Sequence, residues 1–414
     1  MINNLYGCFS KSFIGLNIAQ TCGALNDNLY KLLTIFLFIE IEGIENSAEI
    51  LSLAGAIFVM PFLLFAAFAG ILADKFSKCM IIRWTKVFEV LIALIGMAGL
   101  YLQNKEICYF SIFLFALQST IFGPAKYGIL PEILDKTKLS QANGIITALT
   151  YLAIITGTFL ASFILEITDR SYLTGAFVCL SVSLIGFLGS LAISYTHPQN
   201  PKINLRPVFI GEIFKTLKEL KVFPPLLSAI FASAFFLFAA SFVQLNLIPF
   251  AAITLNLTDT QGGYLFILTA IGIAFGSFII GKLSGKKILL KVVPYACMIL
   301  SFQFFLLDFL SDQLGIAAFL VFGLGAIGGI YQIPLDAYVQ SKSPKEKLGS
   351  VIAANSFLSF AGVLFASFLV FLIGGVFKIN PDKGFTLMGA LTLTYSFYLI
   401  AIFQENPTLQ SGSN

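Results

Sequence analysis

Charged residues are scarce in this sequence of 414 residues. Only 11% are Asp, Glu, Lys or Arg, whereas 58% are hydrophobic and 45 are Phe. A water-soluble domain carries about a quarter of its residues as charged side chains, which cover its surface. The composition therefore excludes an ordinary soluble protein and indicates an integral membrane protein whose side chains are solvated mostly by lipid.

Residues for metal binding and nucleophilic catalysis are also few. The single histidine, His197, lies in a polar segment, and the six cysteines are scattered with no CxxC spacing. These patterns argue against a zinc site and a His-based triad. The sequence has no P-loop and no basic tract, so it predicts neither ATP coupling nor a nucleic-acid partner. We therefore expect no enzyme activity, no cofactor and no metal.

Long apolar runs are abundant, and each membrane crossing needs about 20 such residues. The first run carries Asp27 and Lys31 and is followed by no cleavage site, so it predicts a membrane helix rather than a signal peptide. Twelve spans are predicted, at residues 12–40, 49–72, 79–102, 107–130, 141–165, 173–195, 226–250, 262–284, 289–310, 314–336, 349–375 and 384–403.

The distribution of Lys and Arg sets the predicted orientation. With both termini in the cytoplasm, 18 of the 25 Lys and Arg residues fall on the cytoplasmic side, as the positive-inside rule requires. The longest polar segment, 197–225, contains a short basic amphipathic pattern and is predicted to be a cytoplasmic linker on the membrane surface. It separates a six-helix bundle at 1–196 from another at 226–414.

The two halves share features that indicate an internal repeat. The segments 70–78 and 281–287 each follow the second span of their half and combine glycine with lysine. Pro124 and Pro334 lie at matching places in the fourth spans. Two parallel repeats of six helices are typical of major facilitator transporters, so the expected fold is all-α, with two pseudo-symmetric bundles.

The first of these loops, Gly70–Lys78, reads GILADKFSK. It resembles the major facilitator signature GxxxDRxGRR between helices 2 and 3, with Lys75 in place of the arginine. Gly70 would allow close helix approach, Asp74 would cap a neighbouring helix, and Lys75 and Lys78 would hold the loop at the anionic leaflet. The alternative is an ordinary basic loop that obeys the positive-inside rule.

Charges inside the spans mark candidate functional residues, because each costs about 2.5–3.5 kcal/mol at the centre of a membrane helix. Asp27 and Asn28 lie near the middle of the first span, and Lys31 follows Asp27 at i+4. An Asp27–Lys31 pair could serve substrate binding or gating, or could be purely structural. Glu89 is a weaker candidate that could pair with Lys86.

A lysine in the fourth span is the second candidate. Lys126 lies in GPAKYGILP, where glycine and proline loosen the helix and free backbone groups. It could meet a phosphate as a point charge, or it could be a lysine that snorkels from a helix end. Asp336 occupies the matching position of the tenth span. Gly272/Gly276 and Gly325/Gly329 read as helix-packing pairs.

Four motifs together resemble the lysophospholipid transporter (LplT) family of the major facilitator superfamily. They are ALNDN at 24–28, GPAKYGILPE at 123–132, LSQANG at 139–144, and GG followed by IPLDA near 328–337. The resemblance implies a secondary transporter that flips lyso-phosphatidylethanolamine and lyso-phosphatidylglycerol across the bacterial inner membrane for reacylation. It also implies roles for Asp27, Asn28 and Lys126, and a separate acyltransferase/acyl-carrier-protein synthetase as partner.

One position departs from the family pattern. Better-known members carry an arginine in helix 7 that can pair with the helix 1 aspartate, whereas Ser241 stands here. We therefore expect Lys31 to supply the positive charge within helix 1. Two rival functions stay open: a proton-coupled exporter of drugs or metabolites, with Asp27 or Glu89 as proton carrier, and a membrane anchor for an acyltransferase.

Overall fold

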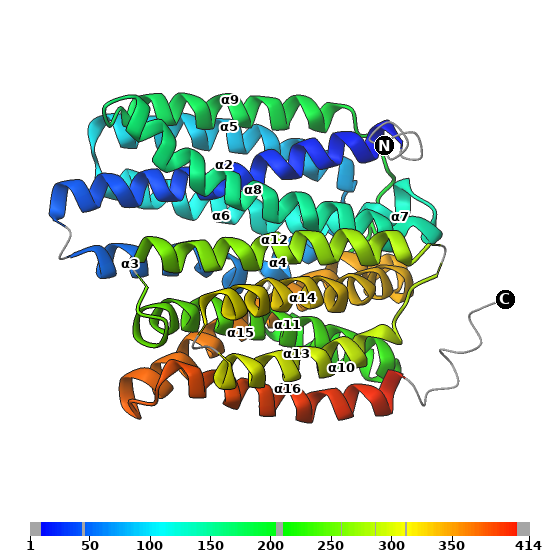
Figure 1. Ribbon diagram of the computed structural model, residues 1–414. Coiled ribbons are helices and arrows are strands. Elements are labelled where there is room, and N and C mark those ends of the chain that lie inside the picture. Colours follow the sequence, from blue (N-terminus) through cyan, green and yellow to red (C-terminus); the bar gives the residue numbers. More distant parts are fainter. Residues whose placement is uncertain are drawn as a thin grey trace. The chain divides into compact units, whose positions relative to one another are not determined.

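The computed structural model describes residues 10–43, 46–203, 210–257, 259–285, 287–310 and 313–403, and every regular element within them is helical (Figure 1). The elements before the linker are α2 (Lys11–Glu42), α3 (Ser47–Leu64), α4 (Ala66–Lys75), α5 (Lys78–Leu102), α6 (Lys105–Gly128), α7 (Leu130–Ile133), η2 (Lys136–Lys138), α8 (Leu139–Ile167) and α9 (Tyr172–Leu191). The linker holds α10 (Ile210–Glu219) and η3 (Leu220–Val222).

The later elements are α11 (Pro224–Pro249), η4 (Phe250–Thr254), α12 (Asp259–Leu283), α13 (Val292–Phe309), α14 (Leu314–Lys342), η5 (Lys345–Lys347), α15 (Leu348–Val370), η6 (Phe371–Val376) and α16 (Pro381–Phe403). Each predicted span coincides with one of these helices, apart from a few residues at the ends. The second span is the exception, because it is broken at Phe65 into α3 and α4, which are bent by 48°.

The helices confirm a multi-pass membrane protein. In the described residues, ten helices are long and apolar enough to cross a membrane, and the bent pair α3/α4 makes an eleventh. The helix α2, with 32 residues, is long enough to be a twelfth, although polar residues such as Asn26, Asp27 and Lys31 interrupt its apolar surface. The predicted count of twelve is consistent with this structure and stays a prediction.

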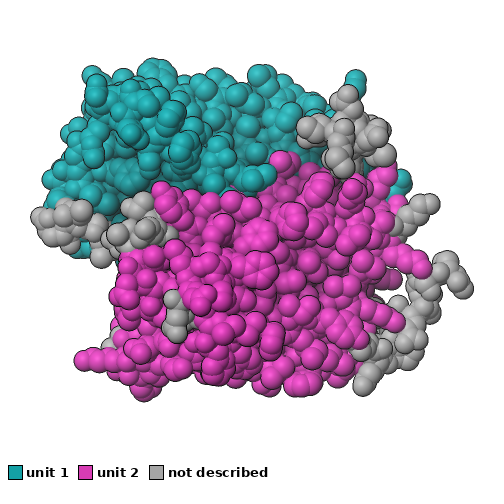
Figure 2. Space-filling view, in the orientation of Figure 1, with its two compact units in different colours: residues 1–135, 152–216, 343–357 teal, residues 136–151, 217–342, 358–414 magenta. Residues whose placement is uncertain are grey.

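The chain folds into two compact units (Figure 2). Unit 1 comprises residues 1–135, 152–216 and 343–357, and unit 2 comprises 136–151, 217–342 and 358–414. The units therefore follow the chain halves except for two short segments, which contain the first turns of α8 and α15. The predicted division into bundles at 1–196 and 226–414, joined by the linker 197–225, does not anticipate this exchange of segments.

Buried polar contacts explain where these two first turns belong. In unit 2, Asn143 of α8 and Gln340 of α14 exchange two hydrogen bonds through their side-chain amides, of 2.8 and 2.9 Å. In unit 1, Asp74 at the end of α4 accepts hydrogen bonds from the first residues of α15. Each segment is thus fixed by the unit that satisfies its buried polar groups.

The same pattern of helix neighbours recurs in the two units. In unit 1, α5 packs against α6 and α9, and α2 packs against α6 and α9. In unit 2, α13 packs against α14 and α16, and α11 packs against α14 and α16. The contact of α3 and α4 with α6 likewise has its counterpart in the contact of α12 with α14. This correspondence supports the predicted pseudo-symmetry of the halves.

Glycines bring α12 and α14 into close contact. A Cβ added to Gly276 would lie 1.8 Å from the carbonyl oxygen of Ala326, and one added to Gly325 would lie 2.1 Å from that of Thr269. Gly272 and Gly329 meet the opposite backbone in the same way. The prediction that these pairs serve helix packing is confirmed, because any larger residue would force the two backbones apart.

The linker contains the expected amphipathic helix. In α10, Ile213 and Leu217 are buried, whereas Lys215 and Lys218 on the opposite side are exposed. Residues 204–209, which complete the predicted linker and include one of its basic residues, lie outside the described part of the chain.

Candidate functional site

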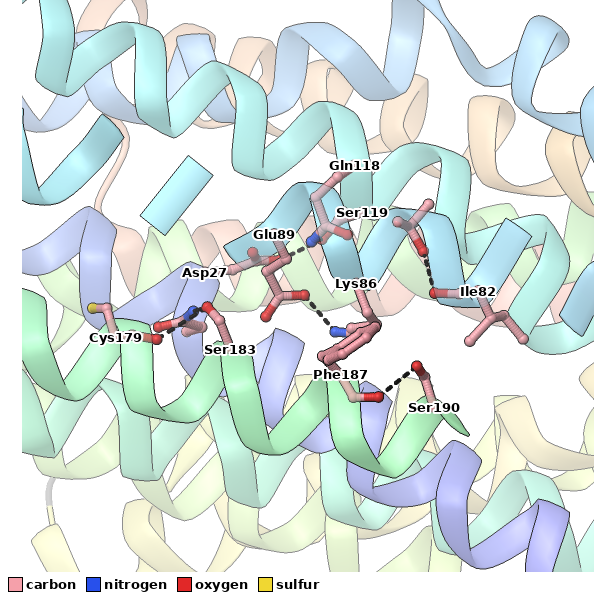
Figure 3. A network of polar contacts seen from close by, with 12 residues as sticks. Asp27, Ile82, Lys86, Glu89, Gln118, Ser119, Cys179, Ser183, Phe187 and Ser190 are labelled. Atoms are coloured by element: carbon pink, nitrogen blue, oxygen red, sulfur yellow. Dashed lines mark hydrogen bonds and ion pairs between the residues drawn. The ribbon is translucent and has the colours of Figure 1, made fainter. Parts of the chain in front are cut away.

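A buried ion pair lies at the centre of unit 1 (Figure 3). The Nζ atom of Lys86 is 2.5 Å from Oε2 of Glu89, and both side chains, one helical turn apart on α5, are almost completely inaccessible to solvent. The expected pairing of these two residues is confirmed. Since an isolated charge in this environment would be strongly unfavourable, each residue stabilises the charged form of the other.

Neighbouring helices provide room for the pair. The Lys86 ammonium lies 4.9 Å from the centre of the Phe122 ring of α6, within cation–π range. On α2, a Cβ added to Gly23 would lie 2.6 Å from the same ammonium. Gly23 therefore leaves room for the ammonium of a buried lysine where α2, α5 and α6 meet.

Asp27 lies one turn after Gly23 on α2 and is also buried. Its Oδ2 accepts a 2.7 Å hydrogen bond from the Ser119 hydroxyl of α6, which in turn accepts one of 3.0 Å from the Gln118 side-chain amide. The other oxygen, Oδ1, is covered by the protein and has no hydrogen-bond partner. Within the described residues, no cation lies within ion-pair distance of this carboxylate, so its charge is stabilised mainly by hydroxyl and amide dipoles.

The predicted ion pair between Asp27 and Lys31 does not form in the described structure. The Lys31 ammonium instead donates a 3.3 Å hydrogen bond to Oδ1 of Asn28 and lies 4.7 Å from the centre of the Phe58 ring of α3. Asp27 turns toward α6 and Ser119. The i+4 spacing puts the two side chains within reach of each other. The Lys31 ammonium, however, lies over the Phe58 ring, and the Asp27 carboxylate turns to the Ser119 hydroxyl.

The signature loop acts as a helix cap. Asp74 is fully buried, and its carboxylate accepts hydrogen bonds from the backbone N–H of Gly349 (2.6 Å) and of Ser350 (2.9 Å) and from the Ser350 hydroxyl (2.5 Å). The predicted capping role is confirmed. Gly70, one turn earlier, allows this approach, because a Cβ there would lie 2.9 Å from the carbonyl oxygen of Gly349.

One lysine of this loop does not lie where the sequence placed it. Lys78 was expected to hold the loop at the lipid head groups, but it is completely buried and forms a 2.7 Å ion pair with Glu132. Gly128 leaves space for its stem, since a Cβ there would lie 2.9 Å from Cε of Lys78. Lys75 is half-buried and donates a 2.8 Å hydrogen bond to the carbonyl oxygen of Ile203.

Lys126 and Asp336 belong to different units. Lys126 in unit 1 is half-buried, with its ammonium 4.5 Å from the centre of the Tyr127 ring. Asp336 in unit 2 is half-buried and accepts a 2.8 Å hydrogen bond from the Gln332 amide. Ser241 of α11, at the place of the family arginine, is buried.

Sequence reasoning missed the residues that hold the aspartate. Gln118, Ser119 and Thr120 interrupt the apolar run FLFALQSTIF, and three adjacent polar residues in a membrane helix were the available signal. Asn26, whose amide donates a 2.7 Å hydrogen bond to Ser183 of α9, is a second buried polar link of α2. In the described part of the chain, no three His, Cys, Asp or Glu side chains gather as metal ligands would.

Known proteins share both the sequence pattern and the fold. The family model of the Major Facilitator Superfamily matches residues 16–367. The lysophospholipid transporter LplT of Escherichia fergusonii is 24% identical over 404 residues, covering 93% of this chain and 95% of that protein. The protein of the same name from Klebsiella pneumoniae is 26% identical over 345 residues, covering 83% of each chain.

Solved structures agree on the architecture. The human organic anion transporter MFSD10 superimposes with a TM-score of 0.75 at 14% identity, covering 94% of this chain and 98% of that one. The Escherichia coli fucose:proton symporter FucP superimposes with a TM-score of 0.71 at 15% identity, again covering 94% and 98%. With the family model matching most of its length, the chain belongs to the major facilitator superfamily.

Proposed function

We propose that the protein is a secondary transporter that moves lysophospholipids across the membrane. The observation that carries this proposal is its similarity, over 93% of its length, to a protein named lysophospholipid transporter LplT. The buried charges of Asp27, Lys86 and Glu89 fit a polar head group, because all three lie in the interior of unit 1. A membrane anchor would need no such charges, and their cost argues for a function.

The substrates we propose are lyso-phosphatidylethanolamine and lyso-phosphatidylglycerol. Their single acyl chain suits helices rich in Phe, and their phosphate suits a lysine such as Lys126. The proposed location is the bacterial inner membrane, with both termini and the linker helix α10 in the cytoplasm, where the lysines of α10 would face anionic lipids. A separate acyltransferase/acyl-carrier-protein synthetase would consume the transported lipid.

A transport assay with purified protein tests this function. Proteoliposomes would receive fluorescent lyso-phosphatidylethanolamine, lyso-phosphatidylglycerol or a diacyl phospholipid, and a membrane-impermeant quencher would report the label that crosses. We expect both lysolipids to cross faster than in protein-free liposomes, and the diacyl lipid to cross at the protein-free rate. Lysolipid movement equal to that of protein-free liposomes would refute the proposal.

The predicted orientation has its own test. Single cysteines introduced at Lys218 and Lys345 should react only with reagents that reach the cytoplasm, and those at Lys105 and Lys383 only with reagents added outside. The reverse labelling of either pair would refute the orientation.

One observation favours a second candidate, a proton-coupled exporter of small molecules. Asp27 is buried without a cation partner among the described residues, and its Oδ1 has no hydrogen-bond donor. A proton would neutralise such a carboxylate. The two functions differ in their response to an uncoupler, which would abolish exporter activity driven by a proton gradient and leave lysolipid movement in symmetric liposomes unchanged.

A further inference from the structure

The helix α2 presents an acid and a base that form no ion pair with each other. Asp27 and Lys31 are separated by one turn, about 6 Å along the axis at 1.5 Å per residue. Ser119 holds the carboxylate on one side, and Asn28 with the Phe58 ring holds the ammonium on the other. Opposite charges in a membrane protein usually pair with each other, so two that are held apart indicate a ligand that carries both charges.

Both residues border a partly exposed strip of unit 1. On α2, Thr21, Ala24, Asn28 and Lys31 are half-buried and recur at helical spacing, so they share one face. Asp27 adjoins this face beside Asn28. These four residues are small or polar, as a polar head group requires, and the half-buried Leu25 and Leu32 lie beside them on the helix.

The neighbouring helix α6 continues the same strip. Ser119, Gly123 and Lys126 are half-buried and follow one another at helical spacing, and Ser119 is bonded to Asp27. A Cβ added to Gly123 would meet no atom within 4 Å, so open space lies beside the helix at this point. We define the α2/α6 strip as these seven residues together with Asp27.

Other charges near the strip are already satisfied. Glu89 is bound to Lys86 at 2.5 Å, and both are buried beneath the strip against Gly23 and Phe122. Glu89 has a cation within ion-pair distance, whereas Asp27 has none in the described structure. A cationic group that reached Asp27 would replace the missing partner.

We propose that Asp27 and Lys31 form a zwitterion-binding pair that selects ethanolamine head groups over glycerol head groups. Lys31, together with Lys126 of the same strip, receives the phosphate. The Asp27 carboxylate receives the primary ammonium, which is joined to that phosphate by an ethylene linker. The carboxylate can accept the ammonium beside the Ser119 hydroxyl, because each carboxylate oxygen has more than one acceptor site. A glycerol head group offers hydroxyls but no positive charge, so it leaves Asp27 uncompensated.

This inference rests on the proposed function, and it predicts a preference that the proposed function alone does not. The readout is the ratio of initial transport rates for lyso-phosphatidylethanolamine and lyso-phosphatidylglycerol in the same proteoliposome preparation. This ratio is independent of how much protein inserts and folds. We expect a ratio well above one for the unchanged protein and a fall of about tenfold for Asp27→Asn, since hydrogen bonds to charged groups are the strong ones.

Two further variants complete the test. Lys31→Gln should lower both rates together, because both lipids carry the phosphate, and should leave their ratio unchanged. Glu212→Gln is the control, since it neutralises an exposed acid of α10 that has its own lysine and lies outside the strip, and it should also leave the ratio unchanged.

Each failure has a distinct meaning. An unchanged protein that moves neither lysolipid refutes the proposed function, and the head-group proposal with it. An unchanged protein that moves both lipids at equal rates refutes only the head-group proposal. The head-group proposal is likewise refuted if Asp27→Asn keeps the original ratio, or if Glu212→Gln lowers the ratio to the same extent.

Discussion

Removing one partner of the buried Lys86–Glu89 pair should destabilise the protein strongly. In Glu89→Leu, the Lys86 ammonium keeps only the face of the Phe122 ring, 4.9 Å from its centre. In Lys86→Leu, Oε2 of Glu89 loses its donor, and the carboxylate is left with none because Oε1 already has none. An uncompensated buried charge of this kind costs about 3–5 kcal/mol.

The double variant Lys86→Leu/Glu89→Leu should be much less harmful. It removes both charges of the pair, and apolar side chains of similar volume often replace a buried ion pair at little cost. The assay is thermal unfolding in detergent, followed by circular dichroism. At about 2 °C per kcal/mol, each single variant should lower the midpoint by roughly 6–10 °C, and the double variant by less than either.

The exposed pair Lys215–Glu212 supplies a matched control. It has the same three-residue spacing, but its atoms are 3.5 Å apart and its side chains are 64% and 47% exposed. Exposed pairs contribute about 0–1 kcal/mol, so Lys215→Leu should hardly change the midpoint. The reasoning is refuted if Glu89→Leu shifts the midpoint no more than Lys215→Leu. It is also refuted if the double variant lowers the midpoint by as much as the shifts of Lys86→Leu and Glu89→Leu added together.

Three further predictions concern the cap, the lysine of α6 and the glycine contact. Asp74→Asn should weaken the cap of α15 by about 0.5–2 kcal/mol and speed amide hydrogen exchange in its first turn, because an amide offers one acceptor oxygen where the carboxylate offers two. Lys126→Ala should reduce lysolipid transport at least tenfold while leaving membrane insertion normal, because the phosphate loses its counter-charge; proteoliposome flux with quantified protein measures this. Gly276→Val should abolish monodisperse folded protein on size exclusion, since even a Cβ would lie 1.8 Å from a carbonyl oxygen of α14; Gly55→Ala, in open space on α3, should have no such effect.

Each of these three predictions has an outcome that would contradict it. Unchanged exchange at the start of α15 in Asp74→Asn would mean that the cap contributes nothing to local stability. Near-normal flux in Lys126→Ala would favour the alternative of a snorkelling lysine. A folded Gly276→Val protein with wild-type stability would show that α12 and α14 tolerate wider separation than their backbones suggest.

The sequence by itself determined the membrane class and the positions of the helices. Apolar runs of sufficient length must form helices in a bilayer, where backbone groups have no other partners, so hydropathy alone located the spans. Short motifs also predicted the roles of residues that act on the same helix or on a close neighbour. Asp74 was recognised as a helix cap, Lys86 and Glu89 as neighbours on one helix face, and Gly276 as a packing residue.

Contacts between distant segments were decided only by the tertiary structure. Asp27 and Lys31 satisfied the spacing of an ion pair, yet Ser119 of α6 and Phe58 of α3 determine where each side chain points. Lys78 obeyed the positive-inside pattern and is nevertheless buried against Glu132. Spacing along one helix sets which partners are within reach, whereas the choice among them depends on the side chains that neighbouring helices bring near, and a single sequence does not encode that arrangement in any local pattern.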